Sequence, residues 1–297
     1  MRLDELGTLI ARHAPEGERE IVDGVRIAGV AQTGAPHVST TGTVMVVMAQ
    51  GAKRLAVGDR VVEYRGGDCL IASVDLPITG HFTEASPVLP ALSFALTLRP
   101  ALVAELLLQA PAEVPRPLRA GAPVAAISVR PASTAVVEAA IRMVRLLERP
   151  IDLPILAPML EREITWLLMT GPDGALVRQL GLADSGLSRV GHAVRWIRDH
   201  YAEPIRVEEL ARMASMSPSA FHRTFLRVTA MTPIQFQKQF RLQEARIRLV
   251  ADPHDVAGAA YAVGYESPSQ FSREYRRRFG TPPSHDARRL RLVAEQG

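Results

Sequence analysis

The sequence predicts an α+β chain of two domains: a β-rich N-terminal domain with a helical layer, and a C-terminal domain made only of helices. Length is the first reason, because 297 residues exceed the usual size of one domain. Periodicity is the second: short apolar runs separated by turn residues fill 20–98, and helical spacing replaces them from Pro100 onward. The third is a repeated phrase, SPSAFHRTF at 217–225 and SPSQFSREY at 267–275.

The apolar runs between 20 and 98 lie about ten residues apart, with Gly, Asp and Pro residues between them. Regular short strands joined by turns are typical of an all-β sandwich or barrel. The stretch LAVGDRVVEY at 55–64 predicts a hairpin with Gly58-Asp59 as its two-residue turn. Small residues such as Ala56, Ala72 and Ala95 are candidates for the interior, where they would be compatible with a ligand cavity.

Three amphipathic helices are predicted after the strands, from ALVAELLLQ, STAVVEAAIRMVRLLE and PILAPMLEREITWLLM. The second of them places Val136, Val137, Ala140, Val144 and Leu147 along one stripe. That stripe packs either on the β domain of its own chain or on a second subunit, and the sequence leaves both open. The small, turn-prone segment ADSGLS at 183–188 is the predicted linker, which divides the chain into 1–184 and 185–297.

Both copies of the repeated phrase have the features of a helix start. Ser217 and Ser267 stand at the cap, and each is followed by a Pro at the first helical position, where its missing N–H costs nothing. The aromatic residues within each copy fall four apart and therefore share a buried face. The residues left facing outward are Ser219, His222 and Arg223 in the first copy and Ser269, Gln270, Ser272 and Arg273 in the second.

In each unit, a first helix and a tight turn come before the repeated phrase, and the phrase itself begins the second helix. One long helix over 232–250 joins the two units. This order fits the helix-turn-helix, whose second helix enters the major groove of DNA. Arg, Gln, Ser and His have the hydrogen-bonding groups needed to read base edges. Two plain helical hairpins serving as a scaffold are the alternative, and the pattern alone does not exclude them.

Charge is unevenly distributed between the two parts. Residues 189–297 hold 18 Lys/Arg and 11 Asp/Glu, a net charge of +7, whereas residues 1–188 hold 17 and 20, a net charge of −3. A basic module of about a hundred residues is the footprint expected for phosphate contact. The alternative is an ordinary solvated surface. Within the second copy we predict that Arg273 and Gln270 read bases and that Arg277 or Arg278 grips phosphate.

These segments resemble a known family. LARMASMSPSAFHRTFLRVTAMTPIQFQKQFRLQEARIRL and AAYAVGYESPSQFSREYRRRFGTPP are similar to the paired helix-turn-helix domain of AraC/XylS transcription regulators, over about 188–291. VMAQGAKRLAVGDRVVEYRGGDCLIASVDLPITGHFTEASP resembles the N-terminal domain of one AraC subgroup, in which a cupin-like β-barrel precedes the DNA-binding part. The resemblance implies recognition helices over about 218–228 and 268–279 that occupy successive major grooves about 34 Å apart.

The partners expected from this resemblance are a double-stranded DNA operator, a small-molecule effector bound by the N-terminal domain, a homodimer partner and, for an activator, RNA polymerase. No cofactor is expected. A second hypothesis is a regulator without ligand, whose β domain only dimerises. A third is a cupin-type enzyme fused to a DNA-binding domain. The sequence argues against the enzyme, because His37 and His81 stand alone without the paired ligands that a cupin metal site needs.

Two further features bear on location and sensing. The chain has one cysteine, Cys69, and its N-terminal stretch is charged throughout without a signal-peptide core; we therefore expect a reducing, cytoplasmic location. No membrane span is expected, because the uncharged stretch at 29–52 is broken by polar residues, Gly and Pro. Cys69 lies in an alternating strand segment, where core filling and a reactive sensor thiol are the two interpretations.

Overall fold

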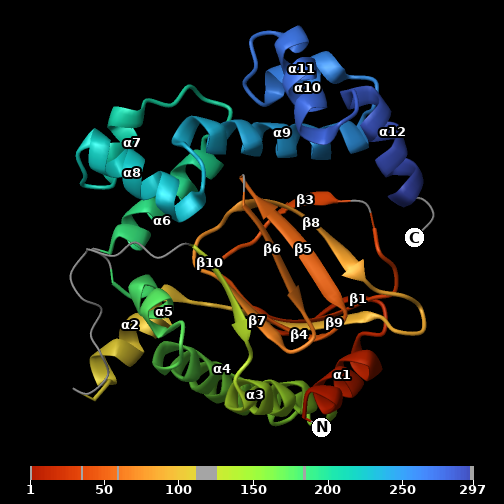
Figure 1. Ribbon diagram of the computed structural model, residues 1–297, viewed down its shortest axis with the longest axis vertical. Coiled ribbons are helices and arrows are strands. Elements are labelled where there is room, and N and C mark those ends of the chain that lie inside the picture. The colour runs from red at the N-terminus through yellow and green to blue at the C-terminus, as the bar shows by residue number, and fades with distance from the viewer. Residues whose placement is uncertain (1, 35, 59, 112–125, 183–184, 295–297) are drawn as a thin grey trace. The chain divides into compact units, whose positions relative to one another are not determined.

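The computed structural model describes residues 2–34, 36–58, 60–111, 126–182 and 185–294. The chain divides into two compact units, one formed by 1–191 with 223–230 and the other by 192–222 with 231–297 (Figure 1). The linker expected at 183–188 lies partly outside the described residues, since 183 and 184 are not among them. The boundary at 184/185 therefore stays a prediction.

The N-terminal unit is built on two antiparallel sheets, as the alternating apolar runs predict. One sheet has six strands in the order β1-β2-β9-β4-β7-β10, and the other has four in the order β3-β8-β5-β6. The strands are β1 (Gly17–Val22), β2 (Val25–Val30), β3 (His37–Thr40), β4 (Val44–Gln50), β5 (Ala52–Val57), β6 (Arg60–Arg65), β7 (Asp68–Ala72), β8 (Pro77–Glu84), β9 (Ala91–Thr97) and β10 (Ile127–Pro131). The predicted N-terminal β fold is confirmed.

The hairpin of β5 and β6 has the predicted register. Val57 lies opposite Arg60, which leaves two residues for the turn, and Gly58 has a φ of 56°. A positive φ in a two-residue connection matches the right-handed twist of the flanking strands. The second turn residue, Asp59, lies outside the described residues.

Helices cover one face of the six-stranded sheet, as Figure 1 shows for α1 and α3 beneath β4, β7 and β9. The helices of this unit are α1 (Arg2–His13), α2 (Pro100–Gln109), α3 (Thr134–Arg145), the short 3-10 helix η1 (Leu146–Glu148), α4 (Leu153–Thr170) and α5 (Gly174–Leu180). Helix α1 contacts β2, β4 and β9, and α3 contacts α1 and α4. Strand residues that share the face of Leu92 against α1, such as Phe94 and Leu96, are almost wholly buried.

The stripe on α3 belongs to the core of its own unit. Val136, Val137, Ala140 and Val144 are at most 5% exposed, which decides the open alternative in favour of packing within the chain for these four. The fifth member, Leu147, lies after α3 in η1 and is half-buried. Of the three alanines expected in the interior of the β domain, Ala56 lies elsewhere. Ala56 lies opposite Val61, which is 63% exposed, and so faces outward. The expectation that Ala56 lines the interior is wrong, because strand residues alternate between faces and the buried members of β5 are its neighbours on either side, Leu55 and Val57.

Ala72 and Ala95 lie on the other face of the six-stranded sheet, away from α1. Ala72 pairs with Val44, and Ala95 pairs with Val46 two positions further along the same strand, so the two alanines share a face. Phe94, which shares the face packed on α1, pairs with Val47 on the opposite side of β4. The sheet face that carries Ala72 and Ala95 also holds the larger side chains Met48 and Leu70, both fully buried.

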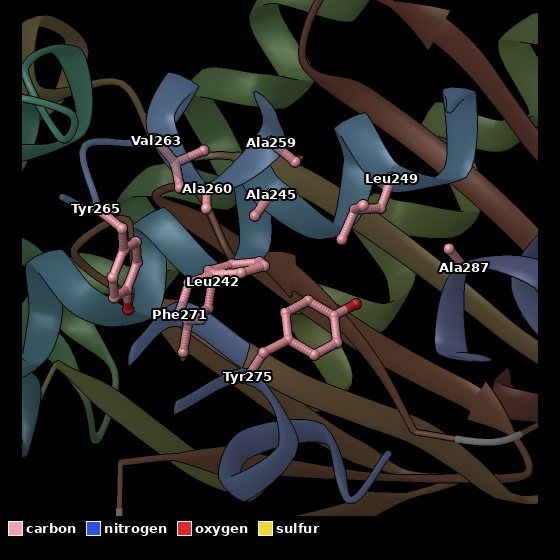
Figure 2. Packing of buried hydrophobic residues seen from close by; sticks show 10 residues of the cluster. All are labelled: Leu242, Ala245, Leu249, Ala259, Ala260, Val263, Tyr265, Phe271, Tyr275 and Ala287. Atoms are coloured by element: carbon pink, nitrogen blue, oxygen red, sulfur yellow. The ribbon is translucent and has the colours of Figure 1, made fainter. Parts of the chain in front are cut away.

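The second part of the chain is helical, as predicted. Its helices are α6 (Gly186–Asp199), α7 (Val207–Met213), α8 (Pro218–Thr229), α9 (Pro233–Ala251), α10 (Val256–Ala262), α11 (Pro268–Phe279) and α12 (Pro283–Ala294). Figure 2 shows the buried cluster formed by α9 to α12, with Leu242, Ala245 and Leu249 of α9 facing Phe271 and Tyr275 of α11. Small residues where α10 meets α9, such as Ala260, allow the close approach of the two helices.

Each helix-turn-helix has the same type of turn. In the first, Ser215 takes a left-handed φ of 50° and the amide of Met216 donates to the carbonyl of Ala211. In the second, Gly264 has a φ of 85° and Tyr265 donates to Ala260. This is the hydrogen-bond pattern of a Schellman helix end. A Cβ at position 264 would lie only 2.0 Å from the carbonyl oxygen of Ala202, so glycine is required there by contact as well as by φ.

The two turns differ in length by one residue. The first helices of the two helix-turn-helix motifs begin 49 residues apart, at Val207 and Val256. The second helices begin 50 residues apart, at Pro218 and Pro268. The additional residue lies between the left-handed turn residue and the cap of α11. The second unit therefore presents its recognition helix after a longer turn, in which Tyr265 is buried.

Candidate nucleic-acid interface

The second candidate recognition helix, α11, separates its two faces clearly. Ser267 caps it, since its Oγ accepts from the amide of Gln270 at 3.3 Å. Phe271 and Tyr275 are fully buried on the inner face. At about 100° per residue, the side chains of Ser269, Gln270, Arg273 and Arg277 fall on the opposite side, and all four are exposed. Ser272 is half-buried at the flank of this surface.

Two arginines near the end of α11 have different environments. Arg277 is exposed. Arg278 is half-buried, and its guanidinium donates to Oε1 of Gln239 on α9 at 3.3 Å. Burial lowers the pKa of Arg278. Arg278 therefore already serves to join α11 to α9, and Arg277 is the better candidate for phosphate.

The first candidate recognition helix, α8, presents a similar outer face. Ser219, His222 and Arg223 are exposed, and Phe221 and Phe225 are buried. The cap of α8 is weaker than that of α11, because Ser217 Oγ is 3.4 Å from the amide of Ala220 and 3.5 Å from Ser219 Oγ. Polar side chains are therefore available on both helices, as the repeat predicts.

Sequence reasoning missed one basic residue of this surface. Arg227 is exposed on α8, one helical turn after Arg223, and stands fifty residues before Arg277. The repeat spacing was the signal that could have found it, because any role given to Arg277 applies equally to its counterpart. Arg223 and Arg227 together make the outer face of α8 basic along two turns.

Helix α9 joins the two helix-turn-helix motifs and begins with a complete capping box. Thr232 Oγ1 accepts from the amide of Gln235 at 3.2 Å, and the Gln235 side chain accepts from the amide of Thr232 at 2.9 Å. Its 19 residues span about 28 Å, close to one turn of B-DNA. Arg241 of α9 donates to the carbonyls of Tyr201 and Gly264, both at 2.7 Å, which holds the turn that precedes α11.

A buried ionic cluster fixes α11 against α9 and α12. Asp286 of α12 has a side chain with no exposure and accepts from Arg246 Nε of α9 at 2.7 Å. The hydroxyl of Tyr275 on α11 donates to the same carboxylate at 3.0 Å, and Arg289 adds a bond of 2.9 Å. Burial alone would raise the pKa of Asp286, but the bonds from Arg246, Arg289 and Tyr275 outweigh it and hold the pKa below its ordinary value.

The position of Cys69 does not suit a reactive sensor thiol. It is 7% exposed on the face of β7 that packs toward the helices, since its partner Val47 lies opposite Phe94. Burial, with smaller contributions from Asp173 and Asp68, raises the pKa of the Cys69 thiol to about 12. A reactive cysteine requires a lowered pKa and access to solvent, so both features favour core filling.

Other functions leave little trace in the described parts of the chain. Among the residues placed by the structure, no group of three or more His, Cys, Asp or Glu could hold a metal ion. His37 and His81 lie in β3 and β8, and no ligand set surrounds them within those residues. Over the same ranges, 2–34, 36–58, 60–111, 126–182 and 185–294, none of the helices combines the length and apolar character needed to cross a membrane.

Two family models match the chain in the order that the fold suggests. The model of the AraC-type transcriptional regulator N-terminus matches residues 21–176, and a helix-turn-helix domain model matches 210–289. The first alone spans more than half of the chain. The chain belongs to the family of AraC-type transcriptional regulators. The cupin-like domain expected from the resemblance thus corresponds to the unit that contains both sheets, and this AraC-type chain combines it with the helical pair.

Curated relatives match this AraC-type chain in part. The transcriptional activator RhaS of Salmonella agona is 29% identical over 148 residues, which cover 48% of the chain and 51% of RhaS. RhaS of Escherichia fergusonii is 31% identical over 96 residues, 32% of the chain and 34% of RhaS. The chain therefore matches about half or less of the length of these relatives.

Solved structures show the same overall fold at low identity. An apo ToxT variant from Vibrio cholerae strain SCE256 superposes with a TM-score of 0.54 and 10% identity, covering 89% of this chain and 96% of ToxT. ToxT from Vibrio cholerae O395 bound to (E)-4-(8-methylnaphthalen-1-yl)but-3-enoic acid gives a TM-score of 0.52 at 8% identity, with 92% and 98% covered. These likenesses agree with a β-rich N-terminal domain followed by helices in this AraC-type protein.

The buried cluster generates a stability prediction. Replacing Asp286 with Asn leaves Arg246 buried beside a neutral amide, which we expect to cost about 3–5 kcal/mol of unfolding free energy. Urea denaturation of the full chain, followed by circular dichroism, measures the loss. Asp199→Asn is the matched control, because Asp199 pairs with Arg198 at the surface and should cost about 1 kcal/mol or less. A loss no larger than that of the control would contradict the role given to Asp286.

The same variant carries a pH signature. Because the folded-state pKa of Asp286 is depressed, its contribution is complete above the ordinary value of 3.8 and is lost as the pH falls below it, through the folded-state pKa. The wild type should therefore lose stability in that acid range more steeply than Asp286→Asn, which has no carboxyl to protonate.

Proposed function

We propose that this AraC-type chain is a sequence-specific DNA-binding transcription regulator whose helices α8 and α11 enter successive major grooves. The observation that supports this most directly is the pair of capped helices with buried aromatic residues on one face and exposed Arg, Gln, Ser and His on the other. The residues proposed to contact DNA are Ser219, His222, Arg223, Arg227, Ser269, Gln270, Ser272, Arg273 and Arg277. Arg278 is left out of this set, because it donates to Gln239 and so joins α11 to α9. The proposed location is the cytoplasm.

The proposal predicts the form of the binding site. Selection of random duplexes by the full chain should enrich a motif with two halves centred about ten base pairs apart, one turn of B-DNA. Affinity should fall steeply with salt, because phosphate contacts release counterions. An absence of any enriched motif at low salt would contradict the proposed function.

Base reading and phosphate contact separate within α11. Replacing Arg273 with Ala should relax preference at one base position and cost about 1–3 kcal/mol, because a side chain that bonds a base edge discriminates among bases. Replacing Arg277 with Ala should weaken all sequences alike and reduce the salt slope by about one. Competition binding over a panel of duplexes measures both.

The matched control for these two variants is Arg60→Ala, which removes an exposed arginine from strand β6 of the N-terminal unit. It should leave affinity, preference and salt slope unchanged. Equal losses at Arg273 and Arg277 that do not depend on sequence would refute the division of roles between them.

Activation of transcription is the form of regulation that the relatives favour. RhaS, which matches 32% and 48% of the chain in the two relatives described above, is named a transcriptional activator. Contact with RNA polymerase is part of the proposal in that case. An enzymatic role is not proposed, because the family is one of transcription regulators and no group of three or more His, Cys, Asp or Glu among the described residues could hold a metal ion.

We infer that a small molecule bound by the N-terminal unit controls DNA binding. In support, the β domain and its helices form a separate compact unit, and ToxT, which shares the fold, has been solved with a small carboxylic acid bound. Control requires the ligand to favour one state of the chain, because a ligand that binds both states equally shifts nothing. The competing proposal is a β domain that serves dimerisation alone.

Operator binding in the presence of candidate metabolites decides between these two. A true effector should raise the melting temperature of the chain and change operator affinity about 5- to 150-fold, the size of typical allosteric coupling. The response should survive Cys69→Ser, because a buried thiol of raised pKa offers no covalent capture. If no metabolite changes either quantity, the dimerisation-only alternative is the better account.

A homodimer is proposed from an exposed apolar stripe on α4 and the turn before it. Ile151, Ile155 and Met159 are spaced by four and are 91%, 68% and 62% exposed. Met159 lines a groove of about 430 Å³ between α3 and α4, together with Leu146 and Leu160, and the lining also holds both Arg and Glu side chains. Adjacent apolar projections and an apolar groove with charges of both signs give the self-complementary surface that a two-fold contact needs.

Sedimentation of variants tests the dimer. Ile155→Glu should convert a dimeric chain to a monomer, because the new carboxylate would be buried without a partner at the contact. Val61→Glu, at a position 63% exposed on strand β6, is the matched control and should remain dimeric. A monomeric wild type, or a dimer that persists in Ile155→Glu, would exclude this surface.

A further inference from the structure

Glu274 of α11 collects three hydrogen bonds from three different segments. Its Oε1 accepts from Lys238 Nζ of α9 at 2.9 Å and from Gln270 Nε2, one helical turn earlier, at 3.2 Å. Its Oε2 accepts from the hydroxyl of Tyr265, in the turn before α11, at 2.9 Å. The Glu274 side chain is 14% exposed, whereas Gln270 is exposed on the face assigned to DNA. A largely buried carboxylate thus reaches a side chain of the recognition surface.

The chemistry of Glu274 fixes the orientation of Gln270. Burial tends to raise the pKa of Glu274, but the bonds from Lys238, Gln270 and Tyr265 and the charge of Lys238 outweigh burial, so the pKa lies below its ordinary value. An ionised carboxylate can only accept hydrogen bonds. The amide of Gln270 must therefore turn its NH2 group to Glu274, which directs its carbonyl oxygen away from the carboxylate.

The orientation of this amide decides what it can recognise. A free glutamine donates to N7 and accepts from N6 of adenine, and after rotation it can donate to the acceptors of guanine or thymine. Glu274 occupies one of the two N–H groups of this amide, so Gln270 presents its carbonyl oxygen with one free N–H beside it. The free N–H can still donate to a base acceptor, so the discrimination comes from the carbonyl oxygen, which accepts only from an amino group. In the major groove, adenine offers one at N6 and cytosine at N4, whereas guanine and thymine offer none.

We propose that Glu274 is a specificity-determining positioning residue, which holds Gln270 with its carbonyl oxygen outward so that α11 selects adenine or cytosine over guanine and thymine at one operator position. This inference rests on the proposed DNA-binding function. It is particular to the second helix: the matching positions of α8, fifty residues earlier, are Ala220 and Thr224, which cannot form this pair. Lys238 and Tyr265 hold Glu274 in place, and Glu274 itself contacts no base.

The experiment measures base preference with the full chain and duplexes that differ in all four bases at each operator position. The position read by Gln270 is the one at which Gln270→Ala abolishes preference. There the wild type should favour adenine or cytosine by about fivefold or more. In Glu274→Gln, whose amide offers both a donor and an acceptor, Gln270 regains its free rotation, and guanine and thymine should become acceptable to within about twofold.

The double variant Gln270→Ala with Glu274→Gln separates positioning from a merely structural role. If Glu274 acts through Gln270, its replacement in the Gln270→Ala background should change no base preference. Thr224→Ala, at the matching position of α8, is the control and should leave the preference at this position unchanged. Melting temperatures of all variants show whether the helical unit remains folded.

Two kinds of result would overturn the inference. Wild-type preference for guanine or thymine at the position of Gln270 would refute the outward carbonyl. A uniform loss of affinity in Glu274→Gln, with the wild-type base preference retained, would reduce Glu274 to a structural residue. In both cases sequence-specific binding by the wild type stands. Only the absence of any sequence preference in the wild-type chain would remove the proposed function together with this inference.

Discussion

Asp286 has no exposed side-chain surface, yet it is ionised and accepts bonds from Arg246 on α9, Tyr275 on α11 and Arg289 on its own helix. A buried charge is tolerated only when its hydrogen-bonding capacity is satisfied, so these helices must keep one mutual arrangement. Apolar packing alone would permit α11 to slide or rotate on α9, because it is not directional. The ionic cluster supplies the direction, and the outward face of α11 is fixed as a result.

The tandem units show how one plan is adapted twice. Both use a seven-residue first helix, a left-handed turn residue and a Ser-Pro start for the second helix. The second turn has one more residue and contains Tyr265, whose hydroxyl reaches Glu274. Through that bond and Arg241, which holds the carbonyl of Gly264, the longer turn becomes part of the support of α11.

The N-terminal unit divides its apolar residues between two purposes. Those on α1, α3 and the helix-facing side of the six-stranded sheet, Cys69 among them, form a closed core. Those at Ile151, Ile155 and Met159 remain exposed, and Met159 lines a groove. The sequence does not distinguish the buried group from the exposed group, because periodicity reports which residues share a face of a helix and not what covers that face.

The sequence by itself determined the division into a strand-rich part and a helical part, the Ser-Pro starts of α8 and α11, and the outer faces carrying Arg223 and Arg273. These features depend on neighbours within one or two turns of the chain. Only the tertiary structure decided that Arg278 donates to Gln239 and that Lys238 and Tyr265 hold Glu274. It also decided that Ala56 faces outward and that Cys69 is buried. These features depend on residues brought together from distant parts of the chain, and local periodicity contains no record of which element will cover which side chain.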